Sequence, residues 1–280
     1  MRTSRSRQVV AGAAVSLAGA GVTAVALGGF LRAQARAARR AIGKPLGEEA
    51  HRSDRLYKKK YGDAVELLLL GDSIAAGLGA DSPEHTLGAQ LATRLAKRAR
   101  RSVHLVTAAR VGSESSMLPA QLASLPPDYR ADVAVIVVGG NDVTHRVKVA
   151  DSVRHLGEVV RALRAQGTEV VVGTCPDLGA LTAVPQPLRG LGRRASRQLA
   201  AAQHEEVTRL GGRAVSLAEV VGPFFVTQPD EMFALDRFHP SGAGYRRTAK
   251  AVLPSVLAAL GVEEHVPFGH HPPRSARAGS

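Results

Sequence analysis

Short apolar runs alternate with longer amphipathic segments through most of this chain. The short runs are rich in Val, Leu and Ile at consecutive positions, which predicts strands that are buried on both faces. The longer segments repeat Leu and Ala at helical spacing with Arg and Lys between them, which predicts amphipathic helices. The predicted strands are 65–70, 103–107, 132–138, 169–172 and 214–217, and the predicted helices are 86–101, 150–165, 188–210 and 242–260.

This alternation indicates the fold class. Parallel strands need a crossover connection, usually a helix, and parallel sheets are covered by helices on both faces. We therefore predict one doubly wound α/β domain over residues 62–262. In it a mostly parallel five-stranded sheet lies between two helical layers, as in a flavodoxin-like three-layer α/β/α fold. Residues 263–280 have no periodicity and are predicted to be a disordered tail, in which His270 and His271 are solvated.

The N-terminal region has a different pattern. A basic start at 1–8 precedes 23 residues without a charged side chain at 9–31, and a basic linker follows at 32–61. A helix of that length can cross a hydrocarbon core of about 30 Å. We predict a transmembrane helix that anchors the protein by a single pass, because the run is longer than a signal-peptide core and basic residues follow it directly. The alternative is a signal peptide cleaved near Ala33-Gln34-Ala35 and a secreted protein; the orientation of an anchored domain stays open.

The distribution of charge narrows the possible partners. The formal net charge is +13, but residues 1–60 carry +10 of it and residues 61–264 only +1. The chain has no Trp and 4% aromatic residues, so the predicted domain lacks the basic stripe and stacking platforms of a nucleic-acid-binding surface. We expect no nucleic-acid partner, and we attribute the basicity to a segment beside a membrane, where Lys and Arg are attracted to anionic lipids.

Glycine-rich polar turns follow three of the predicted strands. Ligands of open parallel sheets bind beyond the carboxyl ends of the strands, so these turns are candidates for one site. The turns are Gly71-Asp72-Ser73, Arg110-Val111-Gly112-Ser113 and Gly139-Gly140-Asn141-Asp142, and a fourth block, Asp236-Arg237-Phe238-His239-Pro240, lies near the end of the domain. An aspartate three residues before a histidine, together with a serine and an amide, indicates a hydrolytic centre.

The order and content of these four blocks resemble the SGNH/GDSL hydrolase superfamily over residues 65–260, with GDSI in place of GDSL in the first block. The resemblance implies a serine esterase or lipase that cleaves carboxylic esters through an acyl-enzyme. Its substrate would be a small-molecule or lipid acyl ester. No cofactor and no metal site are expected, and motifs of competing hydrolases such as GxSxG and HExxH do not occur.

Each candidate residue has a chemical role in this interpretation. Ser73 is the predicted nucleophile, and His239 is the base, since a hydroxyl attacks only if a neighbouring group takes its proton. Asp236 would orient the imidazole of His239. The resemblance implies an oxyanion hole formed by the backbone N–H groups of Ser73 and Gly112 and by the side-chain amide of Asn141.

Structural alternatives stand beside these roles. Ser73 could merely cap a helix, the Asn141-Asp142 pair could form a turn, and Asp236 with His239 could be a surface capping pair. Asp72, His145 and Cys175 are expected to be structural, with Cys175 buried. Four apolar residues before the last block could line an acyl groove, although a core position is favoured for them; they are Phe224, Phe225, Met232 and Phe233.

Two other functions remain open at this point. One is deacetylation or acyl transfer on cell-envelope glycans, which the superfamily also supports; the shortage of aromatic residues to stack on sugars disfavours it. The other is a catalytically silent, membrane-anchored binding domain. Such a domain would be expected to lose the serine or the histidine, and both are present here.

Overall fold

A twisted seven-stranded sheet lies at the centre of the computed structural model, which describes residues 28–40, 42–43 and 45–274. The strand order is β1-β3-β2-β4-β5-β6-β7. The five inner strands are parallel, and β1 and β7 pair antiparallel with β3 and β6 at the two edges. The strands are β1 (Leu56–Tyr57), β2 (Ala64–Gly71), β3 (Ser102–Thr107), β4 (Val133–Val137), β5 (Glu169–Gly173), β6 (Arg213–Val215) and β7 (His270–His271).

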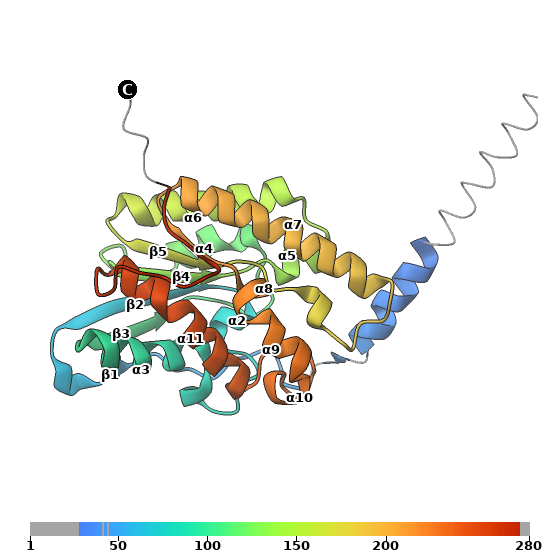
Figure 1. Ribbon diagram of the computed structural model, residues 1–280, viewed down its shortest axis with the longest axis horizontal. Coiled ribbons are helices and arrows are strands. Elements are labelled where there is room, and N and C mark those ends of the chain that lie inside the picture. The colour runs from blue at the N-terminus through green and yellow to red at the C-terminus, as the bar shows by residue number, and fades with distance from the viewer. Residues whose placement is uncertain (1–27, 41, 44, 275–280) are drawn as a thin grey trace, which may run out of the picture.

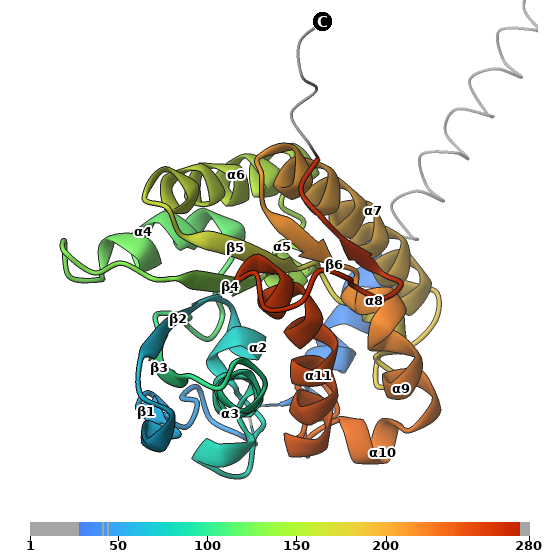
Figure 2. The ribbon, with the colours of Figure 1, turned by 60° about the vertical axis from the view of Figure 1, so that its left-hand side comes forward.

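Helices cover both faces of this sheet (Figures 1 and 2). Figure 2 shows α3 and α11 on one side of the strands and α4, α6 and α7 on the other. The helices are α2 (Ser73–Ala76), α3 (Leu87–Ala99), α4 (Leu118–Ala123), α5 (Gly140–His145), α6 (Val149–Ala165), α7 (Leu188–Arg209), α8 (Leu217–Val220), α9 (Gly222–Thr227), α10 (Pro229–Met232) and α11 (Gly242–Ala259). The 3-10 turns are η1 (Lys59–Tyr61), η2 (Pro83–His85), η3 (Ser115–Met117) and η4 (Leu178–Ala180). The predicted three-layer fold is confirmed.

The consecutive leucines of β2 explain why two helical layers are needed. Side chains of a strand alternate between the two faces, so an unbroken apolar run presents apolar surface to both. Leu67 and Leu69 belong to the core under α3 and α11, whereas Leu68 and Leu70 belong to the core under α6. All four are 1% exposed or less. Both faces of β2 therefore have to be covered by helices.

The predicted number of strands was too low. The two additional strands come from segments that the sequence pattern placed in the linker and in the disordered tail, so both assignments are wrong for these residues. Each strand is two residues long, too short to show a period of two. His270 is buried, and its Nδ1 lies 2.7 Å from Ser255 Oγ. The ring of His271 stacks on that of His204, with centroids 3.8 Å apart. The expectation that both tail histidines are solvated is therefore also wrong.

The segment before β1 is not simply a linker, because residues 28–40 are helical. Four Ala and four Arg make this sequence a strong helix former. The helix packs through Ala38, which is 6% exposed, and through Gln34, whose Nε2 donates to the carbonyl of Gln186 at 2.6 Å. Its arginines are exposed. The predicted basic linker at 32–61 thus contains a docked helix and an edge strand.

The predicted transmembrane helix at 9–31 lies outside the described residues except for its last four positions. In the part of the chain that the structure describes, no helix is both long and apolar enough to span a membrane. The single-pass anchor stays a prediction.

Candidate active site

The site lies where the strand order changes direction. From the inner strand β2 the chain proceeds to β3 on one side and then to β4 on the other, which leaves a crevice at the carboxyl ends of the strands. Ser73 follows β2 and Asn141 follows β4. The turn after β2 is held tightly: Gly71 has φ 131°, and a Cβ there would lie 1.9 Å from the carbonyl oxygen of Val137. Only glycine allows this approach.

Ser73 is the first residue of α2, and Asp72 is its cap. The Asp72 carboxylate accepts a hydrogen bond from the N–H of Ile74 at 2.9 Å. The structural alternative for Ser73, that it caps the helix, is therefore wrong. As the first helical residue, Ser73 has a backbone N–H with no partner inside the helix, and this N–H is available to an anion.

Three side chains from opposite ends of the domain form one hydrogen-bonded chain. Ser73 Oγ lies 3.0 Å from His239 Nε2, and His239 Nδ1 lies 2.5 Å from Asp236 Oδ2. An ionised carboxylate can only accept, so Nδ1–H donates to Asp236 and Nε2 is left to accept the serine proton. Asp236 is only 6% exposed, and His239 is partly buried. They are therefore not a surface capping pair.

Asp236 is held in its ionised form by its neighbours. Its burial opposes ionisation, but the hydrogen bonds from the His239 ring and from the backbone N–H groups of His239 and Phe238 outweigh burial, so its pKa is lowered. The two backbone bonds, both 3.0 Å, fix the carboxylate within the turn. The local sequence thus positions the acid relative to the imidazole.

Asp72, which neighbours the serine, behaves in the opposite way. It is 2% exposed, and burial raises its pKa from 3.8 to about 7 despite the hydrogen bond from Ile74 and the nearby His239. Asp142 adds to the shift by repulsion. Asp72 therefore caps α2, and burial of its carboxyl opposes ionisation. This agrees with the structural role expected for it.

The two other predicted oxyanion donors differ in their position. Asn141 lines the same pocket as Ser73 and His239, and its Nδ2 donates to the carbonyl of Ser113 at 3.0 Å, which leaves one amide hydrogen for a ligand. Gly112 is exposed and is not among the residues that line the pocket. Its backbone φ of 80° favours glycine. Space does not, because a Cβ at this position would meet no atom within 4 Å. The structure places Asn141 in the same pocket as the serine, whereas Gly112 is not part of the pocket lining.

Two buried polar residues hold the site: Gln121, which the sequence pattern missed, and Asp142, which it included in a glycine-rich turn. Gln121 accepts from the N–H of Gly71 at 2.8 Å and donates to its carbonyl at 2.7 Å and to Ser113 Oγ at 3.0 Å. Asp142 accepts from Ser152 Oγ at 2.7 Å and from the N–H of Ser115. Gln121 lies in α4, in a segment that contains no recognisable motif. Both residues attach the loop after β3 to its neighbours.

A mostly apolar pocket of about 80 Å³ opens beside Ser73 and His239. Of the four residues considered for an acyl groove, Phe225 and Phe233 line it and pack edge to face with centroids 4.8 Å apart. Met232 is buried in the core, and Phe224 packs against the core. The remaining apolar lining comes mainly from Leu178, Ala180, Leu181, Leu217 and Val221.

The remaining candidates are structural. Cys175 is buried as predicted, and burial raises the pKa of its thiol. His145 pairs with Glu114 at 2.7 Å and does not line the pocket. Among residues 28–40, 42–43 and 45–274, no group of three or more His, Cys, Asp or Glu is arranged to hold a metal ion.

Comparison with known proteins identifies the same segment. Residues 69–247 match the model of the GDSL-like lipase/acylhydrolase family. A GDSL-like esterase of Mycobacterium tuberculosis is 34% identical over 288 aligned positions, which cover 98% of this chain and 90% of that protein. The domain is thus similar in sequence to an esterase over almost its whole length.

Solved structures give the same result for the fold. The crystal structure of TesA superposes with a TM-score of 0.57 at 25% identity, covering 69% of this chain and 99% of that one. A lipase/acylhydrolase from Enterococcus faecalis superposes with a TM-score of 0.53 at 20% identity, covering 72% of this chain and all of the other. An acetylxylan esterase from Geobacillus stearothermophilus has a TM-score of 0.53 at 19% identity over 73% of this chain and 97% of that chain.

Proposed function

Since the chain belongs to the GDSL-like lipase/acylhydrolase family and is an ester hydrolase, we propose that it cleaves carboxylic esters with Ser73 as nucleophile, His239 as general base and Asp236 as the group that orients the imidazole. The observation that carries this proposal is the continuous path from Asp236 through His239 to Ser73, with separations of 2.5 and 3.0 Å. An acyl transfer through serine needs such a path.

The first half of the proposed reaction forms an acyl-enzyme. Ser73 Oγ attacks the acyl carbon while His239 Nε2 takes the hydroxyl proton, and Asp236 stabilises the imidazolium that results. The carbonyl oxygen becomes an oxyanion as the new C–O bond forms. When the tetrahedral intermediate collapses, the bond to the alcohol breaks and His239 returns the proton to the leaving alkoxide.

The second half regenerates the enzyme. Water attacks the acyl carbon, gives its proton to His239 Nε2, and the acid leaves as Ser73 takes the proton back. In both halves the free N–H of Ser73 and the amide of Asn141 are the proposed donors to the oxyanion, with the N–H of Gly112 as a third donor. Because Gly112 is exposed and does not line the pocket, substrate would have to extend beyond the lining residues to meet its N–H.

The dimensions of the pocket favour a short acyl chain. Its volume of about 80 Å³ is roughly half of the 150 Å³ of a cavity that holds benzene. Phe225 and Phe233 line the pocket and would contact such a chain. We expect turnover of chromogenic esters to be highest for acyl groups of about two to four carbons, because a longer chain would extend beyond the pocket.

The proposed nucleophile is tested by substitution with a matched control. Ser73→Ala should lower kcat for a soluble butyrate ester by about 10⁴ or more, because no other group can form the acyl-enzyme. The control is Ser116→Ala, an exposed serine on η3, which should keep full turnover. The free energy of unfolding should change by less than about 0.5 kcal/mol in Ser116→Ala. In Ser73→Ala it should fall by no more than about 1.5 kcal/mol, because one hydrogen bond of a buried side chain is lost. Full turnover by Ser73→Ala would refute the mechanism.

The two alternatives are not favoured. The comparisons identify esterases and acylhydrolases, and the acetylxylan esterase is a likeness of fold at 19% identity. A silent binding domain would have no reason to retain a serine, an imidazole and a carboxylate in hydrogen-bond contact.

A further inference from the structure

Exposed apolar side chains lie in or beside the segments that form the active-site pocket. Leu235 is 87% exposed and directly precedes Asp236, and Val226 is 60% exposed and directly follows the pocket residue Phe225. Leu191, in the first turn of α7, is 49% exposed. The segments that line the pocket thus also carry large apolar side chains that contact water.

These segments lie at one end of the molecule. Figure 1 shows α9, α10, the N-terminal end of α7 and the helix at 28–40 together at the right-hand side. The first turns of α7 pack on η4, which lines the pocket. The helix at 28–40 is joined to the loop between η4 and α7 by the hydrogen bond from Gln34 to Gln186. We call this end, with Phe30, Leu191, Val226 and Leu235 as its apolar residues, the docking face.

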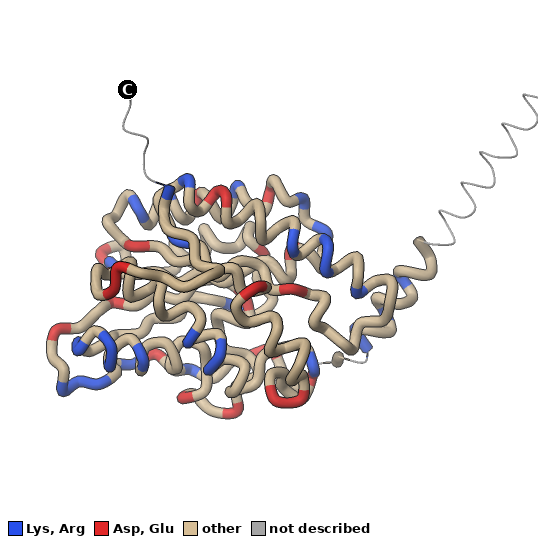
Figure 3. The backbone as a smooth tube through the Cα atoms, in the orientation of Figure 1, with Lys and Arg blue, Asp and Glu red and all other residues tan. Residues whose placement is uncertain are grey.

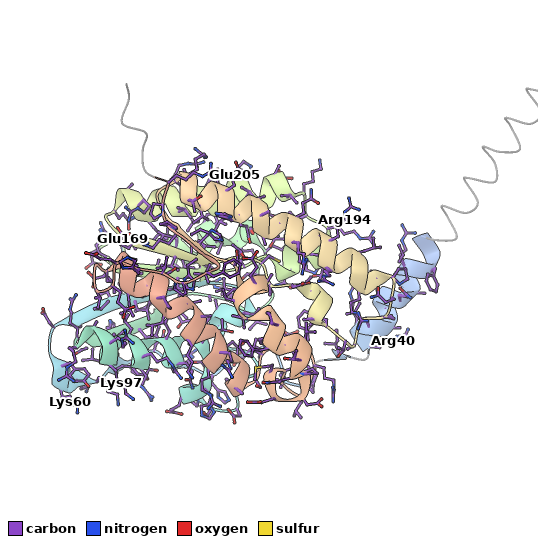
Figure 4. The ribbon with its side chains drawn as sticks, in the orientation of Figure 1. Arg40, Lys60, Lys97, Glu169, Arg194 and Glu205 are labelled. Atoms are coloured by element: carbon purple, nitrogen blue, oxygen red, sulfur yellow. The ribbon has the colours of Figure 1, made fainter. Side chains whose placement is uncertain are left out.

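The docking face is also strongly basic. Residues 28–40 and 188–197 together contain eight arginines and no acidic residue. Figure 3 shows Lys and Arg on the first half of α7 and on the helix at 28–40, and Figure 4 labels Arg194 and Arg40 among them. Three acidic residues are at this end too: Asp230 and Glu231 on α10, and Asp177 directly before η4. Asp230 pairs with Arg237 at 2.9 Å, and Asp177 pairs with Arg197 at 3.0 Å and with Arg193 at 3.5 Å, so the arginines outnumber the acids. The balance of charge is complementary to an anionic surface.

The chain enters the described structure at this same end. Residues 9–27, which precede the helix at 28–40, have no charged side chain. Phe30 is 52% exposed on that helix. The most apolar stretch of the sequence is therefore covalently joined to the docking face and not to the opposite end of the domain.

We propose that the docking face binds an anionic phospholipid bilayer, so that the pocket mouth faces the membrane and the ester is taken from the membrane surface. Apolar side chains inserted at the headgroup level and arginines attracted to anionic lipids are the two components of interfacial binding. The inference rests on the proposed ester hydrolysis for its substrate, but the membrane contact can be measured without turnover.

The first experiment measures insertion directly in the full-length protein. Because Cys175 is buried, Leu235→Cys can be labelled selectively with an environment-sensitive fluorophore. Vesicles of phosphatidylcholine with phosphatidylglycerol should shift its emission to the blue. A label on Val262→Cys, an exposed residue just beyond the C-terminal end of α11, should not respond. Equal responses at the two positions would overturn the proposal. A shift that depends on protein concentration without vesicles would also overturn it, in favour of a second copy of the chain.

The second experiment measures catalysis on two forms of one ester. Arg40→Gln/Arg194→Gln should lower kcat/KM about 25-fold for a butyrate ester carried on a lipid anchor in vesicles with phosphatidylglycerol, and should leave the soluble butyrate ester unchanged. The matched control is Lys60→Gln/Lys97→Gln, which removes two charges at the opposite end of the molecule (Figure 4). Equal losses in both double variants would refute the docking face. Failure of the wild-type protein to hydrolyse the soluble ester would instead refute the proposed function.

Discussion

The carboxyl end of the central strands and the two edges of the sheet are built in different ways. At the carboxyl end, Asp72, Gln121 and Asp142 are buried polar groups, each with hydrogen-bond partners. At the edges, β1 and β7 are two residues long and pair with one neighbour each. The difference indicates where a substitution lowers stability most. A substitution in the buried polar cluster removes several hydrogen bonds at once, whereas one in an edge strand removes a few that water can replace.

The largest expected effect is on turnover and comes from the acid of the proposed triad. Asp236→Asn should lower kcat at pH 7 by about 10⁴, because a neutral amide neither stabilises the imidazolium nor selects the tautomer that leaves Nε2 free. The assay is hydrolysis of a soluble butyrate ester. Asp230→Asn, an exposed carboxylate on α10, is the control and should keep its rate. A loss of less than tenfold for Asp236→Asn would show that His239 is oriented by other contacts.

The next effect is on the stability of the tight turn after β2. Gly71→Ala should lower the free energy of unfolding by more than about 4 kcal/mol, because the new Cβ would overlap the carbonyl of Val137 and φ is 131°. Gly261→Ala is the control: its φ is also positive, at 68°, but a Cβ there meets open space. It should cost about 1 kcal/mol. Equal costs in urea unfolding would mean that β2 can move away from β4.

A third prediction concerns the pH dependence that Asp72 imposes. Its pKa is about 7 in the folded protein against a usual 3.8, so between these values the folded state binds more protons and stability falls as the pH rises. Asp72→Asn removes this cost and should raise the free energy of unfolding at pH 8 by no more than about 4 kcal/mol. The gain should vanish near pH 4. A gain that does not depend on pH would contradict the assignment of the shift to Asp72.

The smallest effect is expected at the edge strand β7. Burial lowers the pKa of His270 and of His204, which stacks on His271, so the unfolded segment binds protons that the folded one does not. The equilibrium constant for docking residues 264–274 on the domain should therefore fall as the pH drops below about 6.5. It should fall by no more than tenfold per pH unit for each histidine. Hydrogen exchange of this segment, corrected for the intrinsic rate, measures the effect. His270→Phe should reduce the pH dependence; an unchanged profile would assign it to His204.

Much of the interior could be predicted from the sequence. The short β-branched run within 132–138 predicts a buried strand of a parallel sheet, and the observed β4 is Val133–Val137. The long helices were predicted to within two residues at either end, for example 150–165 against Val149–Ala165. Turn residues after these strands were candidates for the site because parallel topology places them at one edge.

Peripheral elements could not be predicted in this way. The strand at His270–His271 forms only because β6 offers an unpaired edge, and the burial of His270 depends on Ser255 in α11. Gln121 belongs to a short helix whose pattern does not indicate contact with Gly71, 50 positions earlier. Local patterns describe what a segment can bury, and they do not identify the partner that buries it.

The same distinction between local pattern and tertiary contact applies to the catalytic residues. By itself the sequence determined which side chains could perform ester hydrolysis and that Asp236 and His239 lie within one turn, because three residues cannot separate far. Only the tertiary structure decided that His239 Nε2 lies 3.0 Å from the Oγ of Ser73, 166 positions away. It also decided that Asn141 lines the same pocket while Gly112 does not. Such distances depend on how helices pack on both faces of the sheet, which is the sum of many contacts that no single segment contains.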